Sequence, residues 1–272
     1  MKTHLVIIDP QNDFCDPERG SLYVKGAEKD MQALAAFIDR HGDRLDEIHV
    51  TLDSHHTLHI AHPIFWKDSQ GQHPAPFTTI TRTDVEAGRW ATTNPNWMER
   101  GLAYVRALEK NNRYQLMIWP PHCRIGTWGH SIFPCVSDAL LAWEERRLAK
   151  VNFLMKGGNL FTEHYSAVVA DVPDDADPAT RLNTSFLDTV SKADRILVSG
   201  EALSHCVANT VTDMGNHFGE AIAKKLVLLR GTSSNVTGCE ALGENFIASM
   251  SKRGMRVMTT DEVTSERLSY KG

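Results

Sequence analysis

The stretch H-L-V-I-I-D-P-Q-N-D-F, from His4 to Phe14, places a short apolar run directly before the carboxylate of Asp9. The run has the length of a buried strand and is too short for a helix. It is followed by Ala27–Arg44, where apolar residues recur at helical spacing, and by a second apolar run at Ile48–Leu52. A strand, a helix and a strand in this order predict a βαβ unit with parallel strands.

The same alternation continues along the rest of the chain. The other expected strands are Gln115–Trp119, Phe153–Met155, Ile196–Ser199, Leu226–Leu229 and Arg256–Met258. The other expected helices are Met98–Lys110, Ser131–Lys150, Ala179–Ala193, His205–Phe218 and Glu240–Arg253. We therefore predict a three-layer, Rossmann-like α/β fold, with a parallel sheet of about six strands and helices on both faces.

The domain organisation is predicted to be simple. No linker rich in Pro, Gly or Ser divides the 272 residues, so we expect one domain over residues 1–272. Ala61–Trp97 holds four prolines and little periodicity, which indicates an ordered insertion at about 61–97. The acidic segment at about 171–178 holds two prolines and is expected to be a solvated loop.

Composition argues against several classes of protein. The net charge is -5, and no basic run offers a surface for nucleic acid. The apolar run Leu5–Ile8 is shorter than the roughly 7–15 residues of a secretory signal and the about 20 of a membrane span. We therefore expect a cytoplasmic protein with no membrane partner. The five cysteines form no C-x-x-C pair, which argues against a disulfide framework and a cysteine-rich zinc site.

Common nucleotide and serine-nucleophile motifs are missing from the sequence. It contains no G-x-G-x-x-G, no G-x-x-x-x-G-K-[ST] and no G-x-S-x-G. A dinucleotide-dependent dehydrogenase, a P-loop NTPase and a serine hydrolase are therefore not supported.

Polar or reactive residues follow five successive expected strands. Asp9 follows the first, Asp53 the second and Lys156 the fourth. The third is followed by W-P-P-H-C, Trp119–Cys123, and the fifth by G-E-A-L-S-H-C, which ends at Cys206. Because ligand sites of parallel α/β sheets lie beyond the carboxyl ends of the strands, these residues predict a functional site at that edge.

Cys206 is the candidate nucleophile of this site. It is expected at the start of a helix, where the helix dipole and a nearby lysine would favour the thiolate. Asp9 as proton acceptor and Lys156 as the nearby cation would complete an activated cysteine. Each residue also has a structural reading, since Asp9 could cap a turn, Lys156 could lie at the surface and Cys206 could be a small core residue.

A second set of residues has the chemistry of metal ligands. Asp53 and His55 share one side of an extended segment, and His122 follows a neighbouring expected strand. A carboxylate with imidazoles suits zinc, iron or manganese and leaves positions open to water or substrate. His59 and His62 crowd the same loop, so the alternative is a solvated histidine-rich loop.

Taken together, these motifs resemble a known family. D-P-Q-N-D-F, D-S-H-(x)3-H, W-P-P-H-C-(x)2-G-T-W-G, K-G with a later Y-S-A, and G-x-A-x-x-x-C-V occur in that order between Asp9 and Val207. The combination resembles the nicotinamidase branch of the isochorismatase-like cysteine hydrolases. The resemblance implies hydrolysis of a small carboxamide, nicotinamide, through a Cys206–Asp9–Lys156 triad and a thioester.

The resemblance also implies roles for further residues. Asp53, His55 and His122 would hold a divalent metal, zinc first with iron or manganese as alternatives, and His59 matches a further histidine position. Phe14 and Trp119 match positions that sandwich the pyridine ring. The Glu201–Ala202 bond matches a cis peptide, which would aim the amides of Ala202 and Cys206 at the oxyanion. The activity would belong to NAD salvage.

Some positions depart from the family pattern and leave alternatives open. His205 stands where Tyr is frequent, Leu203-Ser204 replaces Thr-Asp, and the interval from His55 to His122 is long. A related amidase for another carboxamide or a carbamoyl compound is one alternative, and a catalytically silent binding protein on the same fold is another. The sequence leaves both a monomer and a homo-oligomer open.

Overall fold

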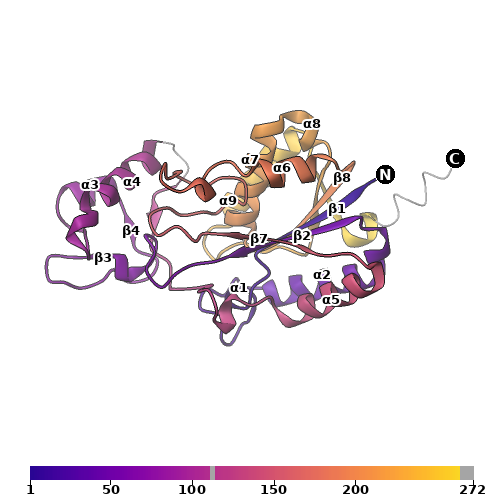
Figure 1. Cartoon of the computed structure of the whole chain (residues 1–272), viewed down its shortest axis with the longest axis horizontal. Coiled ribbons are helices and arrows are strands. Elements are labelled where there is room, and N and C mark those ends of the chain that lie inside the picture. Colours follow the sequence, from indigo (N-terminus) through magenta and orange to yellow (C-terminus); the bar gives the residue numbers. More distant parts are fainter. Residues whose placement is uncertain (111–113, 264–272) are drawn as a thin grey trace.

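A parallel sheet forms the centre of the computed structural model, which describes residues 1–110 and 114–263 (Figure 1). Its strand order is β10-β9-β8-β1-β2-β7, and every neighbouring pair is parallel. The strands are β1 (Thr3–Ile8), β2 (Glu47–Asp53), β7 (Asn152–Lys156), β8 (Arg195–Gly200), β9 (Leu226–Arg230) and β10 (Arg256–Thr259). The predicted α/β fold with a sheet of about six strands is therefore confirmed.

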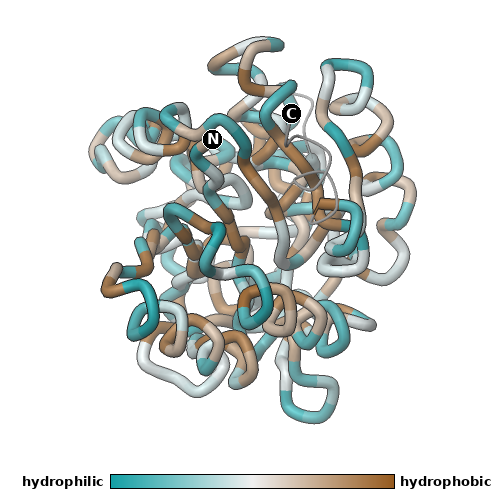
Figure 2. The backbone as a smooth tube through the Cα atoms, turned by 90° about the vertical axis from the view of Figure 1, so that its right-hand side faces the viewer, coloured by the Kyte–Doolittle hydropathy of each residue, from teal (hydrophilic) through white to brown (hydrophobic). Residues whose placement is uncertain are grey.

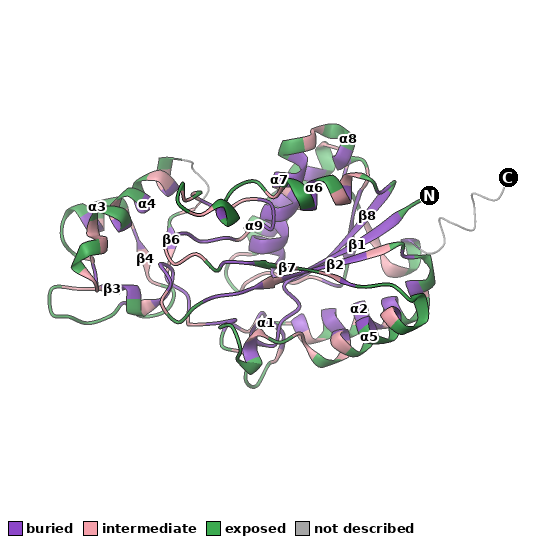
Figure 3. Cartoon of the chain, viewed as in Figure 1, coloured by how far each residue is buried: buried purple, intermediate pink, exposed green. Residues whose placement is uncertain are grey.

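Helices cover both faces of the sheet. On one face lie α2 (Ala27–His41) and α5 (Pro134–Arg147). The other face carries α6 (Thr184–Ser191), α7 (Ala208–Phe218), α8 (Glu220–Ala223) and α9 (Glu240–Lys252). Both layers bury hydrophobic side chains against the strands, so the sheet is the middle of three layers (Figure 3).

The apolar run of the first strand is continuous because β1 is buried on both faces. Successive side chains point to opposite faces of a strand. Leu5 and Ile7 pack in the core beneath α2, whereas Val6 and Ile8 pack in the core on the other face. Hydrophobic residues accordingly run along the central strands in Figure 2. Continuous apolar strands are typical of parallel sheets with helices on both sides.

One expected strand lies outside the central sheet. Within Gln115–Trp119, the structure forms the short strand β6 (Leu116–Met117), which pairs antiparallel with β4 (Thr79–Ile80). Leu116 and Ile118 are buried, which explains the apolar run. The prediction that Gln115–Trp119 forms a strand of the central sheet was wrong. An apolar run indicates that a segment is buried, but it does not indicate to which sheet a strand belongs.

The segment 61–97 is ordered and builds, together with α4, a projection beyond the carboxyl ends of the central strands (Figure 1). It contains β3 (Trp66–Lys67), α3 (Arg82–Glu86) and β5 (Ala91–Thr92), and β3 pairs with β5. The helix α4 (Met98–Lys110) has the bounds that the sequence predicts. Phe65 and Trp66 are fully buried inside this projection and belong to the same hydrophobic core as Leu5 and Ile7 of β1.

Three predicted helices are shorter than expected. Ala27–Arg44 ends as an α-helix at His41 and continues as a 3₁₀ turn, and Ser131–Lys150 reduces to α5. Ala179–Ala193 divides into a 3₁₀ turn at Pro178–Thr180 and α6. The short helix α1 (Asn12–Cys15) has too few residues to show a period, and the sequence did not predict it. Within residues 1–110 and 114–263, no helix is both long and apolar enough to span a bilayer.

Candidate active site

The ends of four adjacent strands bring the candidate catalytic residues together. The ammonium of Lys156, the last residue of β7, lies 2.8 Å from Asp9 Oδ2 and 3.1 Å from Asp53 Oδ1. It also lies 3.6 Å from Cys206 Sγ. All four residues are buried. The strand order β8-β1-β2-β7 explains the convergence, because neighbouring parallel strands end at one edge.

Asp9 is held in place by the neighbouring strand. Its backbone has a φ of 45°, in the left-handed region, where the chain turns away from β1. The Asp9 amide donates to Thr51 Oγ1 at 3.0 Å, and the Thr51 hydroxyl donates to Asp9 Oδ1 at 2.5 Å. These bonds leave Oδ2 directed at Lys156.

Burial and charge set the protonation of these groups. Burial raises the pKa of the Asp9 carboxyl, although Lys156 opposes the rise. Burial by itself would lower the pKa of Lys156, but the charges of Asp53 and Asp9 raise it well above its usual range. Lys156 is therefore an ammonium at neutral pH, and Asp9 has the raised pKa that suits a proton acceptor.

The surroundings of Cys206 differ from the sequence expectation. Cys206 lies in a π-helical turn, Leu203–Val207, and the α-helix α7 begins two residues later. Burial raises the pKa of the Cys206 thiol well above its usual value, and the attraction of Lys156 does not offset this rise. Lys156 therefore favours the thiolate, as expected, but burial favours the protonated thiol more strongly. The resting thiol keeps its proton and needs a base.

A buried cluster of carboxylates and imidazoles lies next to this group. Asp53 Oδ2 is 2.9 Å from His55 Nε2 and 3.3 Å from His122 Nε2. Ring nitrogens of His55, His62 and His122 lie within 4.8 Å of one another, as do ligand atoms of His55, His59 and Glu163. The histidines therefore form a compact cluster, and a solvated loop is excluded by their burial.

The cluster fits a divalent metal. Among the described residues, His62 Nε2 and Glu163 Oε2 are buried without a hydrogen-bond partner. Burial lowers the pKa of His62 to about 3, so its ring is neutral at pH 7 and can donate a lone pair. Burial would also lower the pKa of His55, but Asp53 raises it to about 8. Buried polar atoms without partners are rare, and a bound ion would satisfy them.

Sequence reasoning did not single out Glu163, and it left His62 without a role. Glu163 follows the strand-end Lys156 by seven positions, in a stretch with no recognisable motif. His62 had a weak signal in the crowding of histidines between residues 55 and 62. His59, by contrast, uses both ring nitrogens, because Nδ1 accepts from the Ala61 amide and Nε2 bonds the Thr162 carbonyl, each at 3.2 Å.

The absence of a side chain at Gly157 leaves room for Asp53 and His55 in the cluster. Its φ is +84°, and a Cβ at this position would lie 2.8 Å from Asp53 Oδ1 and 2.9 Å from His55 Cε1. The Gly157 carbonyl also bonds His55 Nδ1 at 3.1 Å, which fixes the orientation of that ring. A side chain at position 157 would therefore collide with both groups.

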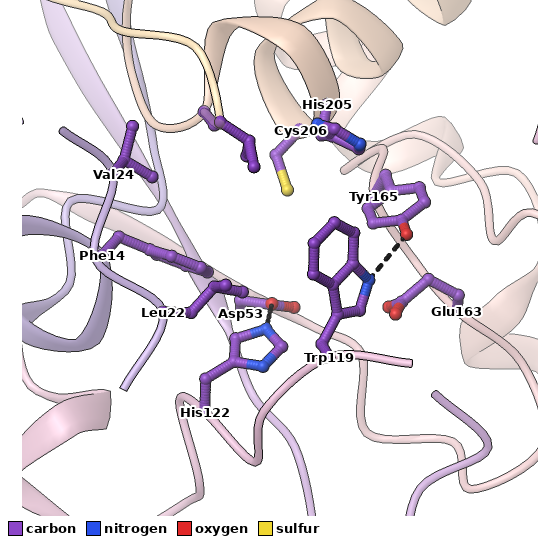
Figure 4. Close-up of a pocket in the computed structure, with 12 residues that line it drawn as sticks. Phe14, Leu22, Val24, Asp53, Trp119, His122, Glu163, Tyr165, His205 and Cys206 are labelled. Carbon is purple, nitrogen blue, oxygen red and sulfur yellow. Dashed lines mark hydrogen bonds and ion pairs between the residues drawn. The ribbon is translucent and has the colours of Figure 1, made fainter. Parts of the chain in front are cut away.

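A pocket joins the two sets of residues (Figure 4). Phe14 and Trp119 lie on its two sides, while the Cys206 sulfur and the Asp53–His122 pair lie at its two ends. Trp119 Nε1 donates to the Tyr165 hydroxyl at 2.8 Å, which fixes the indole ring. Leu22, Val24, Ala202 and Val236 complete the apolar lining. The pocket offers a flat apolar slot with a thiol at one end and metal ligands at the other.

Of the positions that depart from the family pattern, His205 lies at this pocket and Ser204 supports it from behind. His205 lines the pocket edge-on to Trp119, and burial lowers the pKa of its ring to about 4. Ser204 Oγ accepts from the Val236 amide at 3.1 Å and bonds His205 Nδ1 at 2.9 Å. A neutral imidazole therefore forms part of the wall. The Glu201–Ala202 bond preceding this turn is cis.

Comparison with known proteins agrees with the resemblance. No protein-family profile matches the chain. A curated nicotinamidase of Saccharomyces cerevisiae is 26% identical over 212 residues, which span 77% of this chain and 79% of that protein. The resemblance to nicotinamidases that the motifs predict is thereby confirmed.

Solved structures agree on the fold. The yeast nicotinamidase structure matches with a TM-score of 0.65 and 19% identity, covering 94% of this chain and 99% of that one. A pyrazinamidase of Pyrococcus horikoshii in complex with zinc matches with a TM-score of 0.55 and 16% identity, covering 95% and 99%. These likenesses confirm the isochorismatase-like fold.

The close approach at Gly157 leads to a prediction about metal content. We expect Gly157→Ala to lower the occupancy of this cluster by a divalent metal by roughly tenfold or more, because the new methyl group displaces Asp53 and His55. Elemental analysis measures this loss. The matched control is Gly158→Ala, where the nearest heavy atom to a Cβ is Ser54 O at 3.9 Å. A full metal complement in Gly157→Ala would contradict the assignment of the cluster.

Proposed function

We propose that the chain is a metal-containing cysteine amidohydrolase that converts nicotinamide and water to nicotinic acid and ammonia. The observation that carries the proposal is the convergence of Asp9, Lys156 and Cys206 at one end of an aromatic slot. The nicotinamidase relative supports the choice of substrate. The two alternatives, a different carboxamide amidase and a silent binding protein, receive no support from the comparisons.

The first step activates the thiol. Cys206 gives its proton to Asp9, and the sulfur attacks the carboxamide carbon. Lys156 favours this transfer because its charge stabilises the thiolate, 3.6 Å away. Because burial raises the pKa of the Cys206 thiol, the thiol needs the Asp9 carboxylate as a base to become a nucleophile.

The second step stabilises the tetrahedral intermediate. The amides of Ala202 and Cys206 are proposed to bind the oxyanion, and each donor of this kind is typically worth about 2.7–4 kcal/mol. The intermediate collapses when the C–N bond breaks, and Asp9 returns its proton to the leaving ammonia. A thioester between Cys206 and the acyl group remains.

The third step releases the acid. A water molecule gives a proton to Asp9 and attacks the thioester carbon. The C–S bond then breaks, nicotinic acid leaves, and the proton on Asp9 restores the thiol of Cys206. Asp9 thus accepts and donates one proton in each half of the reaction.

Substrate orientation follows from the two ends of the slot. The pyridine ring lies between Phe14 and Trp119, with its carboxamide at Cys206. Asp53, His55 and His122 would hold a divalent ion, which we propose to be zinc rather than iron or manganese because the Pyrococcus relative binds zinc. His59 and His62 each have a ring nitrogen near His55. A divalent ion held there would supply a partner for the ring nitrogen of the substrate.

The cellular role follows from the product. Nicotinic acid is a precursor for NAD, so we propose a part in NAD salvage, in the cytoplasm. One domain over residues 1–272, with an insertion at about 61–97 and an acidic loop at about 171–178, would carry the whole site.

The nucleophile can be tested by substitution. Cys206→Ala should reduce ammonia release from nicotinamide to below a few per cent, because no thioester forms, and the stoichiometric label from iodoacetamide should disappear. Cys239→Ala is the matched control, since this thiol lies outside the pocket and should leave turnover unchanged. Substantial turnover in Cys206→Ala would contradict the covalent mechanism.

The metal end of the slot can be tested with paired substrates. A chelator should suppress hydrolysis of nicotinamide at least tenfold more than hydrolysis of benzamide, which has no ring nitrogen for the ion to hold. The double variant Asp53→Ala, His122→Ala should lose the divalent ion at this end of the slot and, with it, the preference for nicotinamide. Equal loss of both activities would show that the ion does not anchor the ring.

A further inference from the structure

Two histidines and a glutamate lie together far from the active site, in the amino-terminal halves of β1 and β2. His4 pairs with Glu47 across the two strands, and Val6 pairs with His49. Because side chains alternate along a strand, His4, Glu47 and His49 point to the same face of the sheet. That face carries α6, whose Phe186 meets the His49 ring edge-on at 6.0 Å. The active site lies at the opposite ends of these strands.

The three side chains have the spacing of ligands around one ion. His49 Nε2 lies 3.6 Å from Glu47 Oε2, and His4 Nε2 lies 3.7 Å from Glu47 Oε1. One ligand atom from each residue falls within 4.8 Å of the others. Two ligands about 2.1 Å from a tetrahedral ion lie about 3.4 Å apart. Small side-chain movements would therefore complete the geometry.

Both histidines of this cluster are buried, so they are not solvated surface residues. The side chain of His4 is 0% exposed and that of His49 is 2% exposed, whereas Glu47 is 32% exposed. Among the described residues, His4 Nε2 has no hydrogen-bond partner. A buried ring nitrogen without a partner is costly unless something binds it.

A cavity connects two members of this cluster, Glu47 and His49, with solvent. Glu47 and His49 line it together with Asn152 of β7 and with Ser185, Phe186 and Thr189 of α6. Asn152 is the register partner of His49, so it stands beside that ring at the cavity wall. The lysine that also lines the cavity, Lys150, is exposed and can turn its charge into water. An ion could enter from here and keep an open coordination position toward water.

We propose that His4, Glu47 and His49 form a second divalent-metal site, distinct from the active site, that binds Zn²⁺ with two imidazoles and one carboxylate. Two imidazoles and a carboxylate with an open position are a frequent ligand set for zinc. The competing structure is a hydrogen-bonded histidine pair without an ion, since His49 Nε2 lies 3.3 Å from His4 Nδ1. The proposal does not depend on the proposed amidase activity.

Zinc titration of the metal-free protein tests the proposal. The background is Asp53→Ala, His122→Ala, which removes two of the three residues proposed to hold the active-site ion. Isothermal titration with Zn²⁺ should show one ion per chain in this background. Adding Glu47→Gln or His49→Gln should weaken binding by roughly tenfold or more. The matched control is Asp46→Asn, which removes a neighbouring carboxylate that accepts from the Thr3 amide instead, and it should leave zinc binding unchanged.

Two further measurements keep the test decisive. In the otherwise unchanged chain, Glu47→Gln should remove one of two bound zinc ions and leave nicotinamide turnover as it was. Crystals of the unchanged protein soaked in Zn²⁺ should show an anomalous scattering peak between His4 and His49. The absence of that peak, or equal zinc binding by the background and its Glu47→Gln and His49→Gln derivatives, would overturn the site in favour of a metal-free histidine pair.

Discussion

The arrangement of the site depends on the ion pairs that the Lys156 ammonium forms with two buried carboxylates. The ammonium lies 2.8 Å from Asp9 and 3.1 Å from Asp53, and it donates to the His164 carbonyl at 3.0 Å. Two buried carboxylates without a cation would repel each other strongly and would take up protons. With the cation between them, Asp9, directly after β1, and Asp53, at the end of β2, can both stay buried beside Lys156, at the end of β7. The order of the strands in the sheet therefore places the cation between the two carboxylates, and the cation allows both carboxylates to be buried there.

Asp53 connects the two halves of the site. Its Oδ1 faces Lys156, and its Oδ2 faces His55 and His122. His55 and Lys156 together lower the pKa of Asp53 well below its usual range against the effect of burial. One carboxylate thus stays ionised beside the candidate metal ligands and beside Lys156. The slot between Phe14 and Trp119 spans from this group to Cys206, which is the arrangement a flat ring with a carboxamide at one side needs.

Residues at strand ends could be predicted from the sequence, because apolar runs stop at Asp9, Asp53 and Lys156, and parallel strands end together. His122 was placed correctly for a wrong reason, since the strand before it belongs to the projection and not to the central sheet. His62 and Glu163 reach the cluster through loop folding, which leaves no period in the sequence. The protonation of Cys206 could not be predicted because burial, which only the fold defines, outweighs the nearby lysine.

The most direct test of the central claim is the pH dependence of Cys206 alkylation in Lys156→Met. Lys156 lowers the pKa of both Asp9 and Cys206, so its removal should raise both pKa values. The account predicts that the rise of the iodoacetamide rate with pH moves to higher pH, and that the rate at pH 7 falls by roughly tenfold or more. Exposed Lys150→Met should keep the wild-type profile. A wild-type profile in Lys156→Met would contradict the account.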